Sequence, residues 1–406
     1  MSNTVAVVGR IEEELSAVVA EAIGRQLDDA PLGDESEDQR AQRLTAHQLV
    51  KDALAGGQFG AITVSELHSF AGGNTAMLVA RVNTTLTFVV KVDRSPSLVA
   101  EAHHLRSAST DPRLPEATRR AFPQIFAVDD VGPIYGYLME SLEDYATFAS
   151  LLVDGDPAMR ERVLEVAWND VLAPAYLATR QKRVIPNVVE DYFVRAESRL
   201  CRAVERGLLP APDAPIVIRS DGGAIEIPTG WGPQLDDARA RLEQVAPPFS
   251  TFVHGDPNPE NILWGRTDDG EPRVRLIDPK DWGHGDYLFD AAKIGHYLCV
   301  TSPVERDDPP VEASLASATS IEYDREALTA HQKLESSLQT LVARTAEDHG
   351  LPDHERWRDR YELAMAANLL GIVGPRLERA ADGGPATDRT LGWIAFAEGL
   401  RRLAAS

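Results

Sequence analysis

The chain has 406 residues, of which 43% are hydrophobic and 26% charged, a composition that excludes disorder across its whole length. The 63 acidic residues outnumber the 41 Lys and Arg residues, and the formal net charge of −22 argues against nucleic acid or an anionic membrane surface as a partner.

The cysteines and the N-terminal stretch predict a cytoplasmic protein. Cys201 and Cys299 lie far apart and outside any C-x-x-C pattern, so neither a disulfide framework nor a cysteine zinc site is indicated. The short opening apolar stretch is interrupted by Arg10 and three glutamates, which does not fit a signal peptide. No apolar run reaches membrane-spanning length, and no pattern predicts an oligomeric state.

Residues 1–60 are expected to form an N-terminal helical arm with an acidic linker. Apolar residues at helical spacing over 11–27 predict an amphipathic helix. The following stretch, DDAPLGDESED, is polar and acidic, which is typical of a solvated linker.

Residues 61–142 predict a small β-rich lobe. Three apolar and β-branched segments up to Val92 are separated by the turn sequences AGGNT and NTT, which indicates an antiparallel meander. The segment LVAEAHHLRSA predicts a helix, and residues 122–142 predict two further strands. The expected result is a sheet of five antiparallel strands with one helix.

Residues 143–406 predict a larger, mainly helical lobe, so the fold class is α+β. Long helices are expected at 323–349 and 354–380, with a last helix near the C-terminus. Residues 207–247 resemble an insertion, in which 216–228 predict a hairpin on a Ser-Asp-Gly-Gly turn.

The stretch FVHGDPNPENILWG, followed by VRLIDPKDWGHGDYLFDAAK, contains the most informative pattern. Asn261 follows Asp256 by five residues, and Asp278 ends the strand that returns from a predicted hairpin turn. Such a layout can bring three oxygen-bearing side chains together. Because Mg²⁺ takes one or two carboxylates plus substrate phosphates and water, Asn261 and Asp278 suit a Mg²⁺ site. Asp256 could accept a proton from a hydroxyl nucleophile, which predicts phosphoryl transfer.

These residues resemble the aminoglycoside phosphotransferase and choline kinase-like family, which has a two-lobed, protein-kinase-like fold. HGD-x-x-x-x-N at 254–261 looks like its catalytic loop, and IDP at 277–279 stands where the family keeps its metal-binding Asp. The resemblance implies that Asp256 is the catalytic residue, that Asn261 and Asp278 bind Mg²⁺, and that His254 braces the loop.

The stretch GDYLFDAAK at 285–293 is similar to the family's following G-D-x-x-x-D-L-A motif. The resemblance implies that Asp290 gives structural support, and Ala291 departs from the usual Leu. The implied reaction is transfer of the γ-phosphoryl group of ATP, with Mg²⁺, to a hydroxyl group of a small molecule. The acceptor classes are a sugar, an aminosugar, an aminoglycoside or similar antibiotic, or an amino alcohol, and the negative net charge favours a neutral or cationic one.

The same resemblance implies a nucleotide site in the small lobe. A kinase-like lobe places a strand lysine on the phosphates and pairs it with a helix glutamate, and Lys91 and Glu101 match this pair. The turn AGGNT could bring backbone amides to the phosphates, although it lacks the full G-x-G-x-x-G pattern. The remaining nucleotide-binding candidates are the turn residues Gly72, Gly73, Asn74 and Thr75 and the main-chain groups of Glu140 and Leu142.

Candidates for acceptor binding keep two interpretations each. Asp281, His284 and Asp286 follow the metal-binding Asp and could face the acceptor, yet Asp286 could equally cap the next helix or brace the loop. Trp231 could stack on a sugar face or pack in the core.

Two other functions compete with a small-molecule kinase. A protein kinase is disfavoured because Gly255 replaces the Arg of H-R-D and neither D-F-G nor A-P-E occurs. A non-catalytic nucleotide-binding scaffold or sensor would not need a catalytic Asp, so the presence of Asp256 argues against it.

Overall fold

The computed structural model describes residues 63–72, 75–83, 88–129, 135–182, 190–221, 223–280, 283–306, 311, 313–317, 319–348, 351 and 354–405. The N-terminal arm expected at 1–60 lies outside these residues. The chain divides into two units. The described residues of Met1–Asp111, with Arg119–Tyr145 and Ile277–Lys280, form the β unit, and those of Pro112–Thr118, Ala146–Leu276 and Asp281–Ser406 form the helical unit.

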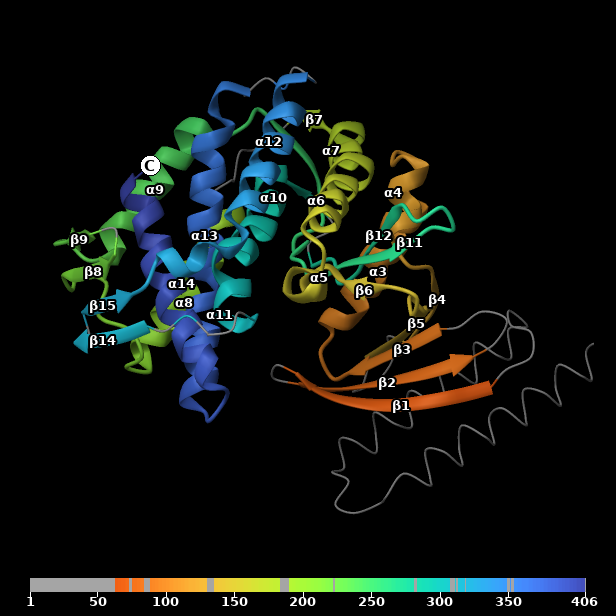
Figure 1. The fold of residues 1–406 in the computed structure, drawn as a ribbon, viewed down its shortest axis with the longest axis horizontal. Helices are drawn as coiled ribbons and strands as arrows, with labels where there is room; N and C mark the ends of the chain where they lie inside the picture. Colours follow the sequence, from red (N-terminus) through yellow and green to blue (C-terminus); the bar gives the residue numbers. More distant parts are fainter. Residues whose placement is uncertain are drawn as a thin grey trace, which may run out of the picture. The chain divides into compact units, whose positions relative to one another are not determined.

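The β unit is an antiparallel five-stranded sheet with strand order β1-β2-β3-β5-β4, shown in orange to yellow in Figure 1. Its strands are β1 (Thr63–Gly72), β2 (Thr75–Asn83), β3 (Phe88–Asp93), β4 (Ile125–Asp129) and β5 (Tyr135–Glu140). The five strands predicted from β-branched segments and turns are therefore confirmed.

Helix α3 (Ser97–Thr110) packs on the sheet, with contacts to β3, β4 and β5. Its buried side chains are spaced as one apolar stripe of a helix: Leu98, Ala102, Leu105 and Ala108. A short helix, α4 (Glu116–Ala121), follows and was not predicted.

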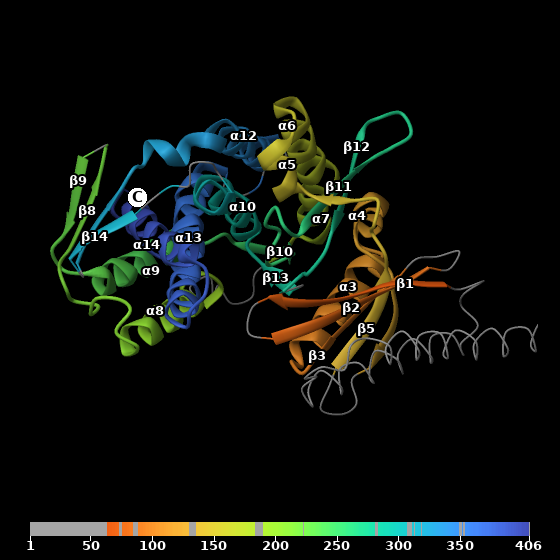
Figure 2. The same cartoon turned by 60° about the horizontal axis from the view of Figure 1, so that its bottom comes forward.

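The helical unit is built around packed helices, of which α13 contacts α8, α10 and α14 (Figure 2). Gly374 lies in α13, and a Cβ atom there would lie 2.5 Å from the carbonyl oxygen of Arg199, so glycine permits this close packing. The helices of this unit are α5 (Phe148–Asp154), α6 (Pro157–Val166), α7 (Ala173–Thr179), α8 (Arg195–Glu205), α9 (Trp231–Val245), α10 (Tyr287–His296), α11 (Ser302–Arg306), α12 (Gln332–Asp348), α13 (Trp357–Ala381) and α14 (Ala386–Ala405). Shorter π or 3₁₀ turns are η1 (Ala167–Leu172), η2 (Glu190–Val194), η3 (Tyr297–Thr301), η4 (Glu326–His331) and η5 (His354–Arg356).

Small sheets frame the loop that contains Asp256. Strand β10 (Phe249–Val253) leads into it and lies between β13 (Gly283–Gly285) and β7 (Gln181–Lys182). Strand β11 (Ile262–Arg266) leads out and pairs with β12 (Pro272–Leu276) and with β6 (Ala146–Thr147). The predicted hairpin after the loop is confirmed.

The predicted 216–228 hairpin is part of a larger sheet. Strands β8 (Ile216–Ser220) and β9 (Gly223–Ile227) join β15 (Ser320–Tyr323) and β14 (Ala313–Ser317) in the order β14-β15-β8-β9. The long helix expected at 323–349 is wrong at its start. Residue 323 ends a strand that pairs in parallel with β8, and 326–331 form the 3₁₀ turn η4, so helix α12 begins only at Gln332.

The whole architecture is an α+β fold with a small antiparallel β unit and a larger, mainly helical unit, which confirms the expected fold class. None of the described helices combines the length and apolar character that crossing a membrane requires.

Candidate active site

Lys91 is the centre of a charged cluster in the β unit. It lies in the middle of β3, opposite Val79 on β2 and Tyr137 on β5, and it is 8% exposed. Its Nζ atom lies 2.9 Å from Oε1 of Glu101 on α3, so the ion pair expected from the sequence is present. Nζ also forms an ion pair with Oδ1 of Asp278, which lies 187 residues further along the chain.

Tyr137 belongs to the same cluster, although the sequence interpretation did not include it. Its hydroxyl group donates a hydrogen bond to Oε1 of Glu101, and Nζ of Lys91 lies 5.8 Å from its ring centre. The sequence signal was its place on β5, because an antiparallel register sets it opposite Lys91.

The pKa values of the cluster follow from burial and from mutual charge. Burial disfavours the ammonium ion of Lys91, but Tyr137, Asp278 and Glu101 outweigh it and raise its pKa well above the usual value. Burial raises the pKa of Glu101, against the effect of Lys91. Burial also opposes ionisation of Asp278, but Lys91, a hydrogen bond with Glu101 and the charge of Lys280 together outweigh it and hold the pKa of that carboxyl below its usual value. Lys91 therefore stabilises one ionised carboxylate at Asp278.

The backbone at Asp278 adopts a left-handed conformation with φ of +55°. A non-glycine residue pays a steric cost there, and such residues concentrate at functional sites. Asp278 follows the end of β12 by two residues, and its side chain is 35% exposed while that of Lys91 is 11% exposed.

In the helical unit, Asp256 and Asn261 occupy one tight loop between β10 and β11. The loop turns at Gly255, whose φ of +82° favours glycine. The side-chain amide of Asn261 donates a hydrogen bond of 2.8 Å to the backbone oxygen of Asp256. The side-chain amide of Asn258 donates one of 3.1 Å to Oδ1 of Asp256. The first bond fixes the side chain of Asn261 against the loop backbone, and the second fixes the orientation of the Asp256 carboxylate.

Asp290 supports the loop from helix α10. Its carboxylate accepts the backbone N–H of His254 at 2.7 Å and that of Gly255 at 2.8 Å, and it also accepts the hydroxyl of Tyr176 at 3.0 Å. Burial raises the pKa of Asp290 to about 7, although these hydrogen bonds oppose the rise. The imidazole Nδ1 of His254 accepts the backbone N–H of Asp256 at 3.3 Å, so His254 contacts the loop from within.

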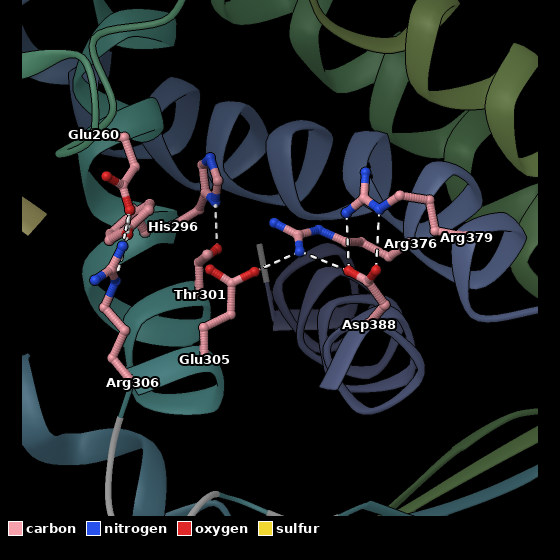
Figure 3. Close-up of polar contacts among 9 residues, drawn as sticks. Glu260, His296, Thr301, Glu305, Arg306, Arg376, Arg379 and Asp388 are labelled. Atoms are coloured by element: carbon pink, nitrogen blue, oxygen red, sulfur yellow. Dashed lines mark hydrogen bonds and ion pairs between the residues drawn. The ribbon is translucent and has the colours of Figure 1, made fainter. Parts of the chain in front are cut away.

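Glu260, which precedes Asn261, is held on the other side of the loop. Arg306, the last residue of α11, forms an ion pair with Oε1 of Glu260 (Figure 3). The hydroxyl of Tyr297 donates to the same oxygen at 2.7 Å and accepts from Nε of Arg306 at 3.1 Å. No sequence pattern points to a role for these three residues, because their contacts join separate elements.

Lys293 is another residue that the sequence interpretation missed. Its Nζ atom lies 3.4 Å from Oδ1 of Asp256. Its position three residues after Asp290 on α10 is the signal that could have indicated a shared helix face.

Asp286 and Trp231 have structural contacts that favour the second of their two interpretations. Asp286 caps α10 by accepting the N–H of Leu288 at 3.1 Å, and it pairs at 2.8 Å with Arg360, both side chains being fully buried. Trp231 is 2% exposed and donates its indole N–H to the carbonyl of Pro210 at 3.1 Å. These contacts are those of capping, bracing and core packing, and an acceptor contact of Asp286 or Trp231 stays a prediction.

Several predicted site residues lie wholly or partly outside the described residues. Gly73, Asn74 and Asp281 are outside them, and the side chains of Thr75 and His284 are too. Gly72 pairs with Thr75 at the end of the β1–β2 ladder. At the predicted adenine segment, the N–H of Glu140 donates to Gln124 at 2.9 Å and the carbonyl of Leu142 accepts from Tyr145 at 3.0 Å.

The part of the chain that the structure describes contains no group of three or more His, Cys, Asp or Glu side chains that could hold a metal ion. Asn261 supplies an amide oxygen and Asp278 a carboxylate. Each is a kind of oxygen ligand that Mg²⁺ takes alongside phosphates and water.

Residues 224–331 match the model of a family described as the phosphotransferase enzyme family. This segment contains the loop with Asp256 and Asn261, as well as Asp278, Asp290 and Lys293. The resemblance drawn from the motifs is confirmed over this segment. No curated protein matches the chain.

Similar solved structures include three kinases of small molecules. Aminoglycoside phosphotransferase APH(4)-Ia is 13% identical, with 84% of this chain and 93% of that chain covered and a TM-score of 0.45. Plasmodium vivax ethanolamine kinase is 10% identical, with 94% and 96% covered and a TM-score of 0.45. Spectinomycin phosphotransferase APH(9)-Ia, in complex with ADP and spectinomycin, is 10% identical, with 92% and 99% covered and a TM-score of 0.44.

Proposed function

We propose that this chain, whose residues 224–331 match the phosphotransferase enzyme family, is a small-molecule kinase that uses ATP and Mg²⁺. It transfers the γ-phosphoryl group of ATP to a hydroxyl group of a small acceptor. The single observation that carries the proposal is the ion-pair cluster of Lys91 with Glu101 and Asp278. A kinase-like nucleotide site needs a strand lysine, a helix glutamate and a metal-binding Asp, and Lys91, Glu101 and Asp278 supply the residue types for these three roles.

Asp256 is the proposed catalytic residue. Its carboxylate orients the acceptor hydroxyl and takes its proton while the hydroxyl oxygen forms a bond to the γ-phosphorus atom. The bond between that phosphorus atom and the oxygen that bridges it to the β-phosphate breaks, and ADP leaves. Asp256 is 5% exposed, and its backbone and side chain are both hydrogen-bonded within the loop, which supports a fixed orientation.

Lys91 is the proposed phosphate ligand, and Glu101 keeps it in place. Asn261 and Asp278 are the proposed Mg²⁺ ligands. When bound, Mg²⁺ neutralises negative charge on the phosphates. The main-chain groups of Glu140 and Leu142, together with the β1–β2 turn residues 72–75, are the proposed contacts to the rest of the nucleotide.

The acceptor is proposed to be a neutral or cationic hydroxylated molecule. The net charge of −22 supports this, because an anionic acceptor would meet additional repulsion. The acceptor classes are a sugar, an aminosugar, an aminoglycoside or similar antibiotic, or an amino alcohol.

A transfer assay tests the proposal. The protein is incubated with γ-labelled ATP, Mg²⁺ and a panel of these acceptors, and the phosphorylated product is identified by mass. Asp256→Ala should lower turnover by about 10²–10⁴-fold. Asp268→Ala, at an exposed position of the β11–β12 turn, is the control and should retain activity. Absence of any labelled acceptor, or full activity in Asp256→Ala, would overturn the proposal.

A further inference from the structure

One face of helix α10 contacts consecutive residues of the loop that contains Asp256. Asp290 and Lys293 are three residues apart, which places them on the same face of the helix. Asp290 accepts the backbone N–H groups of His254 and Gly255, and Nζ of Lys293 lies 3.4 Å from Oδ1 of Asp256. The same helix face thus holds both the loop backbone and the side chain of Asp256.

The pair of Lys293 and Asp256 is well buried. Their side chains are 14% and 7% exposed, whereas the pair of Lys333 and Glu161 on the same unit is 82% and 33% exposed. An exposed pair contributes little, but removal of one partner from a buried pair leaves an uncompensated charge. Lys293 also lies over the ring of Phe289, one turn earlier, with Nζ 5.7 Å from the ring centre. These contacts fix the position of the ammonium group.

Other groups act on this pair from several elements. His296, the next residue on this face of α10, is buried, and burial together with Lys293 lowers its pKa to about 3, so it is neutral at pH 7. Figure 3 shows Arg376 of α13 already paired with Glu305 and Asp388. Asp290 on α10 and Arg199 on α8 interact electrostatically with Asp256. His296 lies in the field of both Asp256 and Lys293, and Arg376 on α13 acts on His296.

Two donors converge on one oxygen of Asp256. Lys293 lies 3.4 Å from Oδ1, and the side-chain amide of Asn258 donates to the same oxygen at 3.1 Å. Both contacts select one rotation of the carboxylate about its Cβ–Cγ bond. Rotation by half a turn exchanges the two equivalent oxygens and restores the same contacts. The two donors therefore fix the plane of the carboxylate and the direction in which its second oxygen points.

We propose that Lys293 is a positioning residue for phosphoryl transfer: together with Asn258 it holds one oxygen of Asp256, so that the other oxygen faces the acceptor hydroxyl. The proposal rests on the proposed function of Asp256. Lys293 acts through Asp256 and contacts neither the nucleotide nor the acceptor. Its loss lowers kcat and leaves the KM for ATP unchanged.

A double-mutant cycle in turnover tests this role. Four proteins are compared: wild type, Lys293→Met, Asp256→Asn and the double variant. The assays are phosphorylation of the best acceptor of the panel and, without acceptor, release of inorganic phosphate from ATP. Lys293→Met should lower kcat by about 10- to 100-fold, the cost of a misplaced catalytic group. In the Asp256→Asn background the same change should alter kcat by less than about threefold, because the group that Lys293 positions is already lost.

Conservative replacement and a matched control complete the design. Lys293→Arg keeps the charge and should lose less than about fivefold in kcat. Lys333→Met removes an exposed lysine and should leave kcat unchanged. A Lys293→Met loss that is equal in both backgrounds, or that Lys293→Arg does not relieve, would overturn the positioning role and leave the proposed function intact.

Failure of the proposed function has a different signature. In that case the wild-type protein neither labels an acceptor nor releases phosphate. The positioning role of Lys293 then fails together with the proposed function. The ion pair itself is tested by urea unfolding of the same four proteins. If the pair is present, the urea midpoint of the double variant is lowered by less than the sum of the two single lowerings. Additive shifts would contradict the contact on which the proposal is built.

Discussion

The carboxylate of Asp290 accepts the backbone N–H of His254 at 2.7 Å, across 36 residues of sequence. The neighbouring N–H of Gly255 reaches the same carboxylate, so one buried side chain satisfies two consecutive backbone donors of the loop. Unpaired buried N–H groups are costly, and the loop conformation therefore depends on Asp290.

This relationship predicts a pH dependence of stability. Burial raises the pKa of Asp290 to about 7, above its ordinary value of 3.8. The folded chain therefore holds an extra proton between these pH values, and the stability that this group contributes is complete below pH 4 and is lost as the pH rises through 7. Asp290→Asn does not titrate. The free energy of unfolding of wild type relative to Asp290→Asn should fall by up to about 4 kcal/mol between pH 4 and pH 8.

Urea unfolding of both proteins across that range measures this difference. Other titrating groups are shared by both proteins and cancel in the comparison. Parallel stability curves for the two proteins would show that the carboxyl of Asp290 does not titrate in this range.

Removal of Lys91 should destabilise the β unit. Lys91→Met leaves the partly buried carboxylates of Glu101 and Asp278 without their shared cation, so we expect a loss of about 1–3 kcal/mol in the free energy of unfolding. Lys91→Met combined with Glu101→Gln should recover part of this loss, because one of the two charges is then removed. Chemical denaturation measures both changes, and a double variant as unstable as the sum of its parts would contradict the coupling.

Arg306 should affect turnover through Glu260. Arg306→Ala removes the ion pair from Glu260, the residue beside Asn261, and leaves it only the hydrogen bond from Tyr297 among the contacts described above. We expect a decrease in kcat of about tenfold, because small displacements of catalytic groups are costly. Glu260→Gln should act similarly, and the two changes together should cost little more than either alone. Arg162→Ala, which removes an exposed arginine paired with Glu165, is the control. Equal kcat values for wild type and Arg306→Ala would rule out this support of the loop.

Asp286 should matter for stability more than for acceptor binding. Arg360 is fully buried against it, so Asp286→Ala breaks a buried ion pair and should cost about 3–5 kcal/mol in unfolding free energy. Replacing both residues, with Asp286→Ala and Arg360→Met, should cost less than Asp286→Ala alone. A folded Asp286→Ala protein with normal stability but a raised KM for the acceptor would instead support the acceptor contact.

The sequence predicted the strands of the small sheet and helix α3 because each depends on the pattern of neighbouring residues. Alternating and β-branched segments predicted β1 to β5, and the apolar stripe of α3 follows from helical spacing. The pairing of Lys91 with Glu101 was predicted from the family resemblance, and the ten residues between them leave room for the strand to lead into the helix. The hairpin after Asn261 was predictable from its turn.

Only the tertiary structure decided which distant side chains share an environment. Tyr137 joins Glu101, Lys293 reaches Asp256, and Arg360 neutralises Asp286, and no spacing rule connects these positions. Trp231 shows the same limit, because an aromatic residue at a helix start has the same sequence signature whether it binds a ligand or packs in the core. The physical reason is that periodicity reports which face of an element is apolar, while burial, pairing and pKa depend on what packs against that face.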